Sequence, residues 1–248
     1  MHNYVAPANL LKNRIIMVTG AGAGIGRTAA LDFARLGATV ILAGKTVEKL
    51  ENIYDQIESE GYNKPAIVPL NLETATAQEY SQIAETIENE FGRLDGLLLN
   101  AAILGNISPI EYYPPELWHK VMQVNVNSQY LLTRSMLPLL RIPGDASVIF
   151  TTSSVGRKGR AHWGAYGVSK FATEGLMQTL ADEMENISNI RFNCINPGAT
   201  RTAMRATAFP GEDPSTLRRP EDIMGLYFYL MGPESTGVNG KTLDAQPK

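Results

Sequence analysis

Short apolar runs alternate with longer amphipathic segments along most of the chain. The apolar runs are rich in β-branched residues and predict strands at Arg14–Thr19, Thr39–Ala43, Ala66–Pro69, Gly96–Leu99, Ser147–Thr151, Ile190–Asn196 and Lys241–Asp244. The amphipathic segments predict helices near Ile25–Leu36, Thr46–Glu60, Thr76–Phe91, Pro115–Leu140, Tyr166–Asn186 and Pro220–Met231. Strands without polar alternation are typical of a sheet that is covered on both faces. The pattern therefore predicts an α/β fold, with about seven parallel strands in one doubly wound sheet and helices on both faces.

No repeat, low-complexity tract or linker interrupts this alternation, so residues 1–248 are predicted to form a single domain. The longest segment without a clear strand or long helix is 197–219, which is rich in glycine and proline. A long irregular segment in a compact domain is often an active-site lid. We expect a substrate lid here, and the alternative is an ordinary surface loop.

Composition and charge exclude several classes of function. The 248 residues are 44% hydrophobic and carry a formal net charge of -3, which allows a sizeable core and makes no electrostatic case for nucleic acid. The single cysteine, Cys194, lies in an apolar run and is interpreted as a buried hydrophobic side chain. No secretory pattern and no membrane-spanning run is evident, so we expect a cytoplasmic protein. His2 and His119 stand alone, and no metal site is expected.

A glycine-rich turn follows the first predicted strand and opens the first predicted helix. It reads Thr19-Gly-Ala-Gly-Ala-Gly-Ile-Gly26. Glycines let the backbone approach a pyrophosphate closely, and the N-terminus of the helix offers free N–H groups to phosphates. The strand–helix context favours a dinucleotide, and the lack of a Gly-Lys-Ser/Thr sequence argues against a nucleoside triphosphate. We expect cofactor contacts from Gly20, Gly22, Ala23, Gly24, Ile25 and Gly26.

The end of the second predicted strand bears on the choice between NADP and NAD. A carboxylate there would bind the ribose 2′-hydroxyl of NAD, but the sequence continues Leu42-Ala-Gly-Lys45-Thr46. Lys45 can pair with a 2′-phosphate, and Arg27 lies near the same loop in sequence. We therefore favour NADP over NAD. The alternative for Lys45 is a solvated lysine at the start of a helix.

Tyr166 and Lys170 lie four residues apart, on one face of a predicted helix. A nearby ammonium group and an oxidised nicotinamide ring both favour the phenolate, so we expect them to lower the pKa of Tyr166 from its ordinary value of about 10. Tyr166 is then a candidate general acid and base. The hydroxyls of Thr151–Ser154 close a predicted strand, at the edge where open α/β sheets bind ligands. A serine hydroxyl there can hold a substrate carbonyl, and the alternative is capping of a turn.

Together these motifs resemble the short-chain dehydrogenase/reductase family, over nearly all of the chain from Arg14 to Asp244. Ser153 stands 13 residues before Tyr166, and Asn125 stands 41 residues before it, as in that family. The resemblance implies a Rossmann-type fold and a catalytic set of Asn125, Ser153, Tyr166 and Lys170. It further implies cofactor contacts from Asn71, Leu72, Asn100, Ala101, Tyr166, Lys170, Pro197, Gly198, Thr200 and Thr202.

The resemblance also implies roles for the catalytic set. Tyr166 exchanges a proton with the substrate oxygen, Ser153 orients the carbonyl, Lys170 lowers the pKa of Tyr166 and holds the nicotinamide ribose, and Asn125 holds a water that links Lys170 to solvent. The sequence departs from the family at Leu99 and Ala102, in Leu99-Asn-Ala-Ala102, and at Ala245-Gln246 near the C-terminus. The first departure puts sheet stability in doubt more than chemistry.

The stretch Val155–Trp163 resembles a bacterial branch of uncharacterised, YciK-like oxidoreductases, with further matching residues in Trp163–Tyr166, Phe171–Gly175, Asn196–Gly198 and Thr200–Met204. The resemblance to this branch implies no particular substrate. Five cations bracket the expected cleft and raise the hypothesis of an anionic substrate, with a solvated basic patch as the alternative: Arg157, Lys158, Arg160, Arg201 and Arg205. Trp163 is a candidate for the pocket rim or for packing. Family members commonly pair the helices that contain Pro115–Leu140 and Tyr166–Asn186, so a homo-dimer or homo-tetramer is expected.

We therefore expect an NAD(P)-dependent oxidoreductase that moves a hydride between the cofactor and a small carbonyl or alcohol substrate. A second hypothesis is a cofactor-binding regulatory or scaffold protein without turnover. A third is an isomerase or lyase on the same fold, which would consume no cofactor.

Overall fold

Seven parallel strands form one sheet in the computed structural model, which describes residue 1 and residues 3–247. The strands lie in the order β3-β2-β1-β4-β5-β6-β7, so successive strands are added on one side of β1 up to β3 and on its other side from β4 onward. Their bounds are β1 Ile15–Thr19, β2 Thr39–Gly44, β3 Ala66–Pro69, β4 Gly96–Leu99, β5 Ala146–Thr151, β6 Ile190–Asn196 and β7 Lys241–Asp244. In an open sheet of this kind, ligands bind where the strand order reverses, outside the carboxyl ends of the strands.

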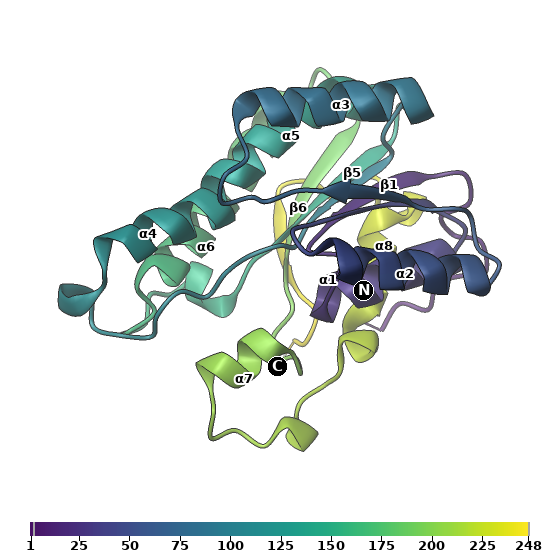
Figure 1. Ribbon diagram of the computed structural model, residues 1–248. Coiled ribbons are helices and arrows are strands. Elements are labelled where there is room, and N and C mark those ends of the chain that lie inside the picture. Colours follow the sequence, from purple (N-terminus) through teal and green to yellow (C-terminus); the bar gives the residue numbers. More distant parts are fainter. Residues whose placement is uncertain (2, 248) are drawn as a thin grey trace.

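Helices cover both faces of this sheet (Figure 1). On one face α1 (Gly24–Arg35), α2 (Val47–Ser59) and α8 (Met224–Met231) surround one hydrophobic core. On the other face α3 (Ala77–Phe91), α5 (Ser128–Arg141) and α6 (Gly164–Met184) surround a second core. Strands β1, β4 and β5 are almost fully buried between these layers, which explains their uninterrupted apolar sequences. The predicted fold class is confirmed.

The structure corrects two of the predicted helices. The single helix expected over Pro115–Leu140 is divided into α4 (Pro115–Met122), a π-helical turn (Gln123–Asn127) and α5. The helix expected from Pro220 begins as a 3-10 turn at Pro220–Ile223 and becomes α-helical only at Met224. Single π-helical turns are frequent at functional sites, and this one contains Asn125.

Segment 197–219 projects from the carboxyl edge of the sheet (Figure 1). It contains a short helix that the sequence did not predict, α7 (Ala203–Ala208), whose first turn is capped by the Thr202 hydroxyl. An isolated parallel bridge between Thr200 and Arg218 joins the two ends of the segment. The segment is therefore a closed loop with internal structure, and its role as a substrate lid stays a prediction.

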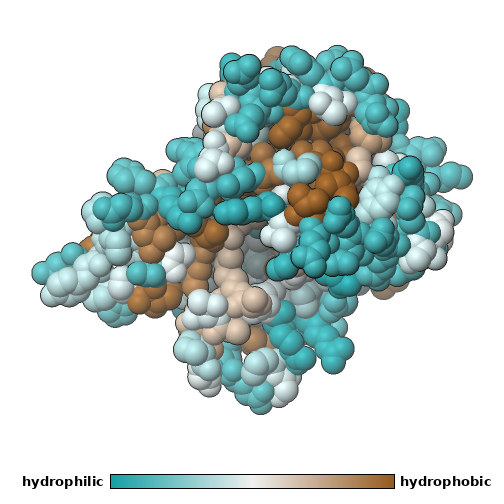
Figure 2. Space-filling view, viewed as in Figure 1, coloured by the Kyte–Doolittle hydropathy of each residue, from teal (hydrophilic) through white to brown (hydrophobic). Residues whose placement is uncertain are grey.

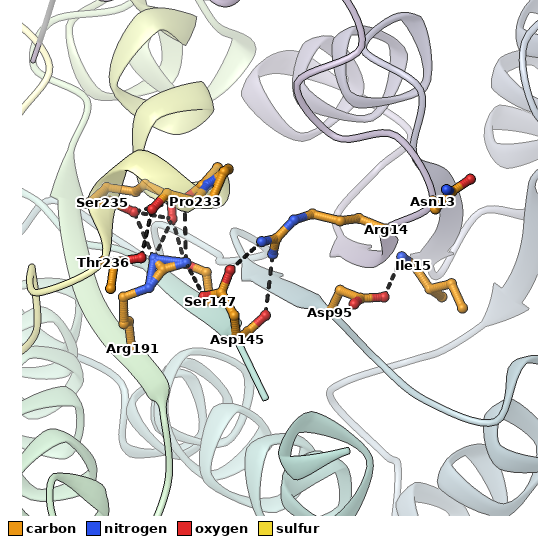
Figure 3. A network of polar contacts seen from close by, with 12 residues as sticks. Asn13, Arg14, Ile15, Asp95, Asp145, Ser147, Arg191, Pro233, Ser235 and Thr236 are labelled. Carbon is orange, nitrogen blue, oxygen red and sulfur yellow. Dashed lines mark hydrogen bonds and ion pairs between the residues drawn. The ribbon is translucent and has the colours of Figure 1, made fainter. Parts of the chain in front are cut away.

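Charged side chains meet at the opposite, amino edge of the sheet (Figure 3). Arg14 and Arg191, which both lie near the starts of strands, are bonded to the two carboxylate oxygens of Asp145. Arg191 also donates to the Ser235 hydroxyl at 2.6 Å. Asp95 accepts the backbone N–H that opens β1 at 2.9 Å. These contacts join strands β1, β4, β5 and β6 where their sequences are far apart.

The cysteine, the histidines and the exposed apolar side chains were also subjects of prediction. Cys194 is a buried free thiol whose pKa is raised to about 12 by burial, so it is not a reactive thiolate. Within residue 1 and residues 3–247, no helix has the length and apolarity to cross a membrane, and no cluster of metal-ligating side chains is found.

His2 lies outside the described residues. Exposed apolar side chains on α5 and α6 include Tyr130, Val168 and Phe171, and the homo-oligomer expected there stays a prediction.

Candidate active site

A cavity of about 560 Å³ lies along the carboxyl ends of the strands. The molecule is visibly hollowed between segment 197–219 and the body of the chain (Figure 2). Almost all of the residues predicted to bind cofactor or substrate line this cavity: Gly20, Ala23, Gly24, Ile25, Lys45, Asn71, Leu72, Asn100, Ala101, Ser153, Tyr166, Lys170, Pro197, Gly198, Thr200 and Thr202. Gly22, Gly26 and Asn125 do not line it. The structure thus brings together residues from seven separate segments of the sequence.

The glycine-rich turn between β1 and α1 forms one wall of the cavity. Gly20 and Gly24 have positive φ angles of 67° and 53°, which other residues adopt only with strain. A Cβ on Gly26 would lie 2.3 Å from the Gly20 carbonyl oxygen, so this glycine allows the helix to start directly against the turn. The first N–H groups of α1 have no intrahelical partner, and the N-cap residue Ala23 supplies no side-chain acceptor for them beside the cavity. This cradle fits the pyrophosphate of a dinucleotide.

Thr19, which was not among the predicted site residues, fixes the next part of the wall. Its hydroxyl accepts the backbone N–H groups of Asn100 at 3.0 Å and of Ala101 at 3.1 Å, and donates to the Leu98 carbonyl at 3.3 Å. Thr151 adds a bond to the Asn100 side chain at 3.3 Å. The only sequence signal for this role was a hydroxyl at the end of a buried strand.

Tyr166 and Lys170 lie on the first turns of α6, at the end of β5. Both side chains are buried, with 8% of Tyr166 and 1% of Lys170 exposed. The Lys170 ammonium donates to the Thr151 carbonyl at 2.7 Å and lies 5.4 Å from the centre of the Tyr166 ring. Ser153 follows β5 and lines the cavity beside them. A hydroxyl, a phenol and an ammonium group therefore meet at one end of the cavity.

Burial shifts the pKa values of both groups. It raises the pKa of Tyr166 to about 12, and a hydrogen bond with Ser153 opposes that rise. It lowers the pKa of Lys170 to about 8. The direction for Tyr166 is opposite to the lowering expected from the sequence, because the protein removes water from the phenol while Lys170 directs its charge toward a carbonyl oxygen. With the protein groups alone, Tyr166 keeps its proton at neutral pH.

Asn125 lies fully buried in the π-helical turn. Its amide accepts the Ile103 N–H at 2.9 Å, donates to the Ile103 carbonyl at 2.9 Å and donates to the Ser169 hydroxyl at 3.0 Å. These bonds tie α6 to the backbone that follows β4 and lines the cavity. The predicted water link from Asn125 to Lys170 stays a prediction.

The end of the cavity away from Tyr166, at the carboxyl ends of β2 and β3, carries exposed charges. Glu73 lies between Lys120, at 2.9 Å, and Lys45, at 3.8 Å. The bond from Lys120 lowers the pKa of Glu73. Two-thirds of the Lys45 side chain is exposed. Arg27, which the sequence placed near this loop, instead donates to Gln56 at 2.8 Å.

Most of the cations that suggested an anionic substrate are engaged elsewhere. Arg157 forms two hydrogen bonds with Asp244, at 2.7 and 3.2 Å. Arg201 donates to the Pro214 carbonyl at 2.7 Å. Of the five cations, only Arg205 lines the cavity, and it is bonded to Glu212 through two contacts of 2.6 Å.

Comparisons with known proteins agree with this geometry. A model of the family described as short chain dehydrogenase matches residues 14–213. The chain is 53% identical to a protein of Escherichia coli strain K12 named uncharacterized oxidoreductase YciK, over all of this chain and 97% of that protein. It resembles the structure of a putative short chain dehydrogenase from Pseudomonas syringae, with 59% identity, a TM-score of 0.97, and coverage of 98% of this chain and 99% of that one. A Shigella flexneri short chain dehydrogenase crystallised in complex with NADP gives 52% identity, a TM-score of 0.95, and coverage of 97% and 100%.

Proposed function

Because the chain belongs to the short-chain dehydrogenase family of oxidoreductases, we propose that it uses NADP(H) to interconvert a carbonyl compound and an alcohol, with Tyr166 as the general acid and base. The observation that carries the proposal is the pairing of Tyr166 with Lys170 at one end of a cavity whose glycine-rich wall fits a pyrophosphate. A buried ammonium group without a carboxylate partner is costly, and such groups are concentrated at functional sites.

The proposed NADP preference is supported by two observations. The Shigella flexneri relative was crystallised with NADP. In this chain Lys45 follows β2, beside the cavity, where it can pair with a 2′-phosphate. The expected contacts from Asn71, Leu72, Thr200 and Thr202 belong to the same proposal, since all four line the cavity.

The proposed chemistry follows from the two buried groups. When bound, the cofactor supplies or accepts a hydride at its nicotinamide ring. Tyr166, whose pKa of about 12 keeps it protonated at neutral pH, donates its proton to the substrate oxygen during reduction. Ser153 donates a hydrogen bond to the same oxygen. Lys170 stays close enough to stabilise the phenolate that remains, and a proton from solvent then restores Tyr166.

The proposal is tested by following NADPH and NADH consumption with a panel of neutral and anionic carbonyl compounds. We expect consumption with NADPH, and a loss of about 10²–10⁴-fold in kcat when Tyr166→Phe removes the proton donor. Tyr130→Phe is the matched control, because that tyrosine is half exposed on α5. NADPH binding, followed by cofactor fluorescence, should be the same in both variants.

Two results would contradict the proposal. NADPH binding without consumption across the panel, with Tyr166→Phe equal to the wild type, favours a regulatory or scaffold protein. Product formation without net NADPH consumption favours an isomerase or lyase.

A further inference from the structure

The end of the cavity beside Tyr166 has apolar walls. Leu104 and Tyr166 belong to a small hydrophobic cluster that is separate from the two cores of the sheet, and side chains of segment 197–219 pack against it. The walls come from both sides of the cavity, from the body of the molecule and from segment 197–219: Leu104, Trp163, Tyr166, Met204, Ala208 and Phe209.

Three of these side chains form an aromatic row. The Trp163 ring lies 5.7 Å from the Tyr166 ring and 5.9 Å from the Phe209 ring, tilted by 47° and 46°. Trp163 precedes α6, whereas Phe209 ends α7. The row therefore crosses from the proposed proton donor to segment 197–219, and all three residues line the cavity.

The charge at this end is already neutralised. The Arg205 guanidinium lies 3.7 Å from the centre of the Phe209 ring and is bonded to both oxygens of Glu212. Among the described residues that line the cavity, the other cations are Lys170, Lys45 and Lys120. Lys170 is buried against Thr151, and Lys45 follows β2, which is three strands from β5 and so about 14 Å away at the usual strand spacing.

We infer that the substrate is an uncharged aromatic carbonyl compound, or the corresponding alcohol, whose ring packs against Trp163 and Phe209. This inference rests on the proposed function. An aromatic ring gains contact with the row, whereas a carboxylate placed there would lose its hydration without meeting an unpaired cation. The inference replaces the anionic substrate that the basic residues of the sequence suggested.

The reaction at this site balances as a two-electron reduction. The carbonyl carbon accepts a hydride from NADPH, the C=O π bond breaks, and the oxygen takes the Tyr166 proton. The products are the aryl alcohol and NADP⁺, and one proton from solvent returns to Tyr166. The reverse direction oxidises the alcohol and releases that proton.

Binding can be measured without turnover because Trp163 is one of two tryptophans in the chain. In a Trp118→Phe background Trp163 becomes the only indole reporter. We would titrate this protein, loaded with NADP⁺, with methyl para-formylbenzoate and with para-carboxybenzaldehyde, which share a ring and differ in charge. We expect saturable quenching by the ester at concentrations at least about tenfold below those needed for the carboxylate. Equal or tighter binding of the carboxylate would overturn the inference.

Two further variants assign the quenching to the correct face of Trp163. The other side of Trp163 lines a separate groove, which also contains Phe171 on α6. Phe209→Ala should weaken ester binding about tenfold, since it removes one ring of the row, whereas Phe171→Ala should leave it unchanged. Weakening by Phe171→Ala alone would place the ester in the groove and overturn the inference.

Turnover separates this inference from the proposed function. If NADPH is consumed with both aldehydes but the carboxylate has the higher kcat/KM, the substrate class is wrong and the proposed function stands. If the ester quenches Trp163 as expected but is never reduced, the cavity takes neutral aromatics and the proposed function fails. For the ester, Trp163→Ala should mainly raise KM, and Trp163→Phe should restore it; a loss confined to kcat would show that Trp163 only positions Tyr166.

Discussion

Buried cations at the two edges of the sheet differ in the number and charge of their partners. At the amino edge, Arg191 is buried but contacts Asp145, Ser235 and two backbone carbonyls. At the carboxyl edge, Lys170 is equally buried, and no ion pair involves it in the part of the chain that the structure describes. Its ammonium group is bonded to a single backbone carbonyl.

This difference separates a structural charge from a functional one. A buried charge with opposite charges around it holds elements together, and removing one partner leaves the other uncompensated. A buried charge with spare hydrogen-bonding capacity costs stability, but it can act on whatever enters the cavity. We therefore expect substitutions at the two edges to change stability in opposite directions and to differ in their effect on turnover.

The largest effect is expected from Lys170→Met. Turnover should fall about a hundredfold or more, because the phenolate of Tyr166 loses its neighbouring charge. Stability at pH 7 should instead rise by about 1–2 kcal/mol, since a buried ammonium group is replaced by an apolar side chain of similar length. Urea unfolding of both proteins measures this difference, and a variant that is less stable than the wild type would contradict the comparison.

The pH dependence of that difference has a definite sign. The pKa of Lys170 is about 8 in the folded protein and 10.5 ordinarily. Between these values the unfolded chain holds more protons than the folded one, so the free energy of unfolding of the wild type rises with pH. The advantage of Lys170→Met should be complete below pH 8 and shrink as the pH rises toward 10.5. A difference that stays constant across this window would show that Lys170 is not shifted.

Asp145→Asn should give the opposite result at the amino edge. The substitution keeps the shape but leaves Arg14 and Arg191 without their carboxylate, and we expect a loss of about 2 kcal/mol after allowing for the partial exposure of Asp145. NADPH consumption by the folded protein at 25 °C should be unchanged. Arg35→Gln is the control, because the Arg35 side chain is half exposed and its pair with Asp32, within one helix, should contribute less than about 0.5 kcal/mol. Equal losses in the two variants would remove the distinction between the edges.

Burial and element length decided which strands and helices could be predicted from the sequence. Strand Gly96–Leu99 was predicted with its observed bounds, because burial on both faces leaves a continuous apolar run. The π-helical turn at Gln123–Asn127 was missed, since one extra residue in a turn hardly disturbs the hydrophobic period. Helix α7 was missed because six residues are too few to show a period.

In the candidate site, too, features set by local sequence were predicted, and features set by distant partners were not. Spacing along one helix predicted that Tyr166 and Lys170 would be neighbours, and the glycine-rich turn predicted the cradle. Partners far apart in sequence were not predictable: Arg157 meets Asp244, and Glu212 neutralises Arg205, so the apparent basic patch is not available to a substrate. The direction of the Tyr166 pKa shift was missed because it depends on burial, which the sequence does not quantify.

The smallest expected effects are at the exposed end of the cavity, where charges are screened by solvent. Lys45→Ala should weaken NADPH binding about three- to tenfold and leave NADH binding unchanged, because only NADPH carries the 2′-phosphate. Glu73→Gln should act in the opposite direction, since it removes the carboxylate that now holds Lys45 and Lys120 and that would repel a phosphate. We expect NADPH binding to tighten about two- to threefold at low ionic strength, with little change in high salt. Fluorescence titrations with both cofactors measure these effects, and weaker binding of NADPH to Glu73→Gln would mean that the carboxylate positions Lys45 for the phosphate instead of competing with it.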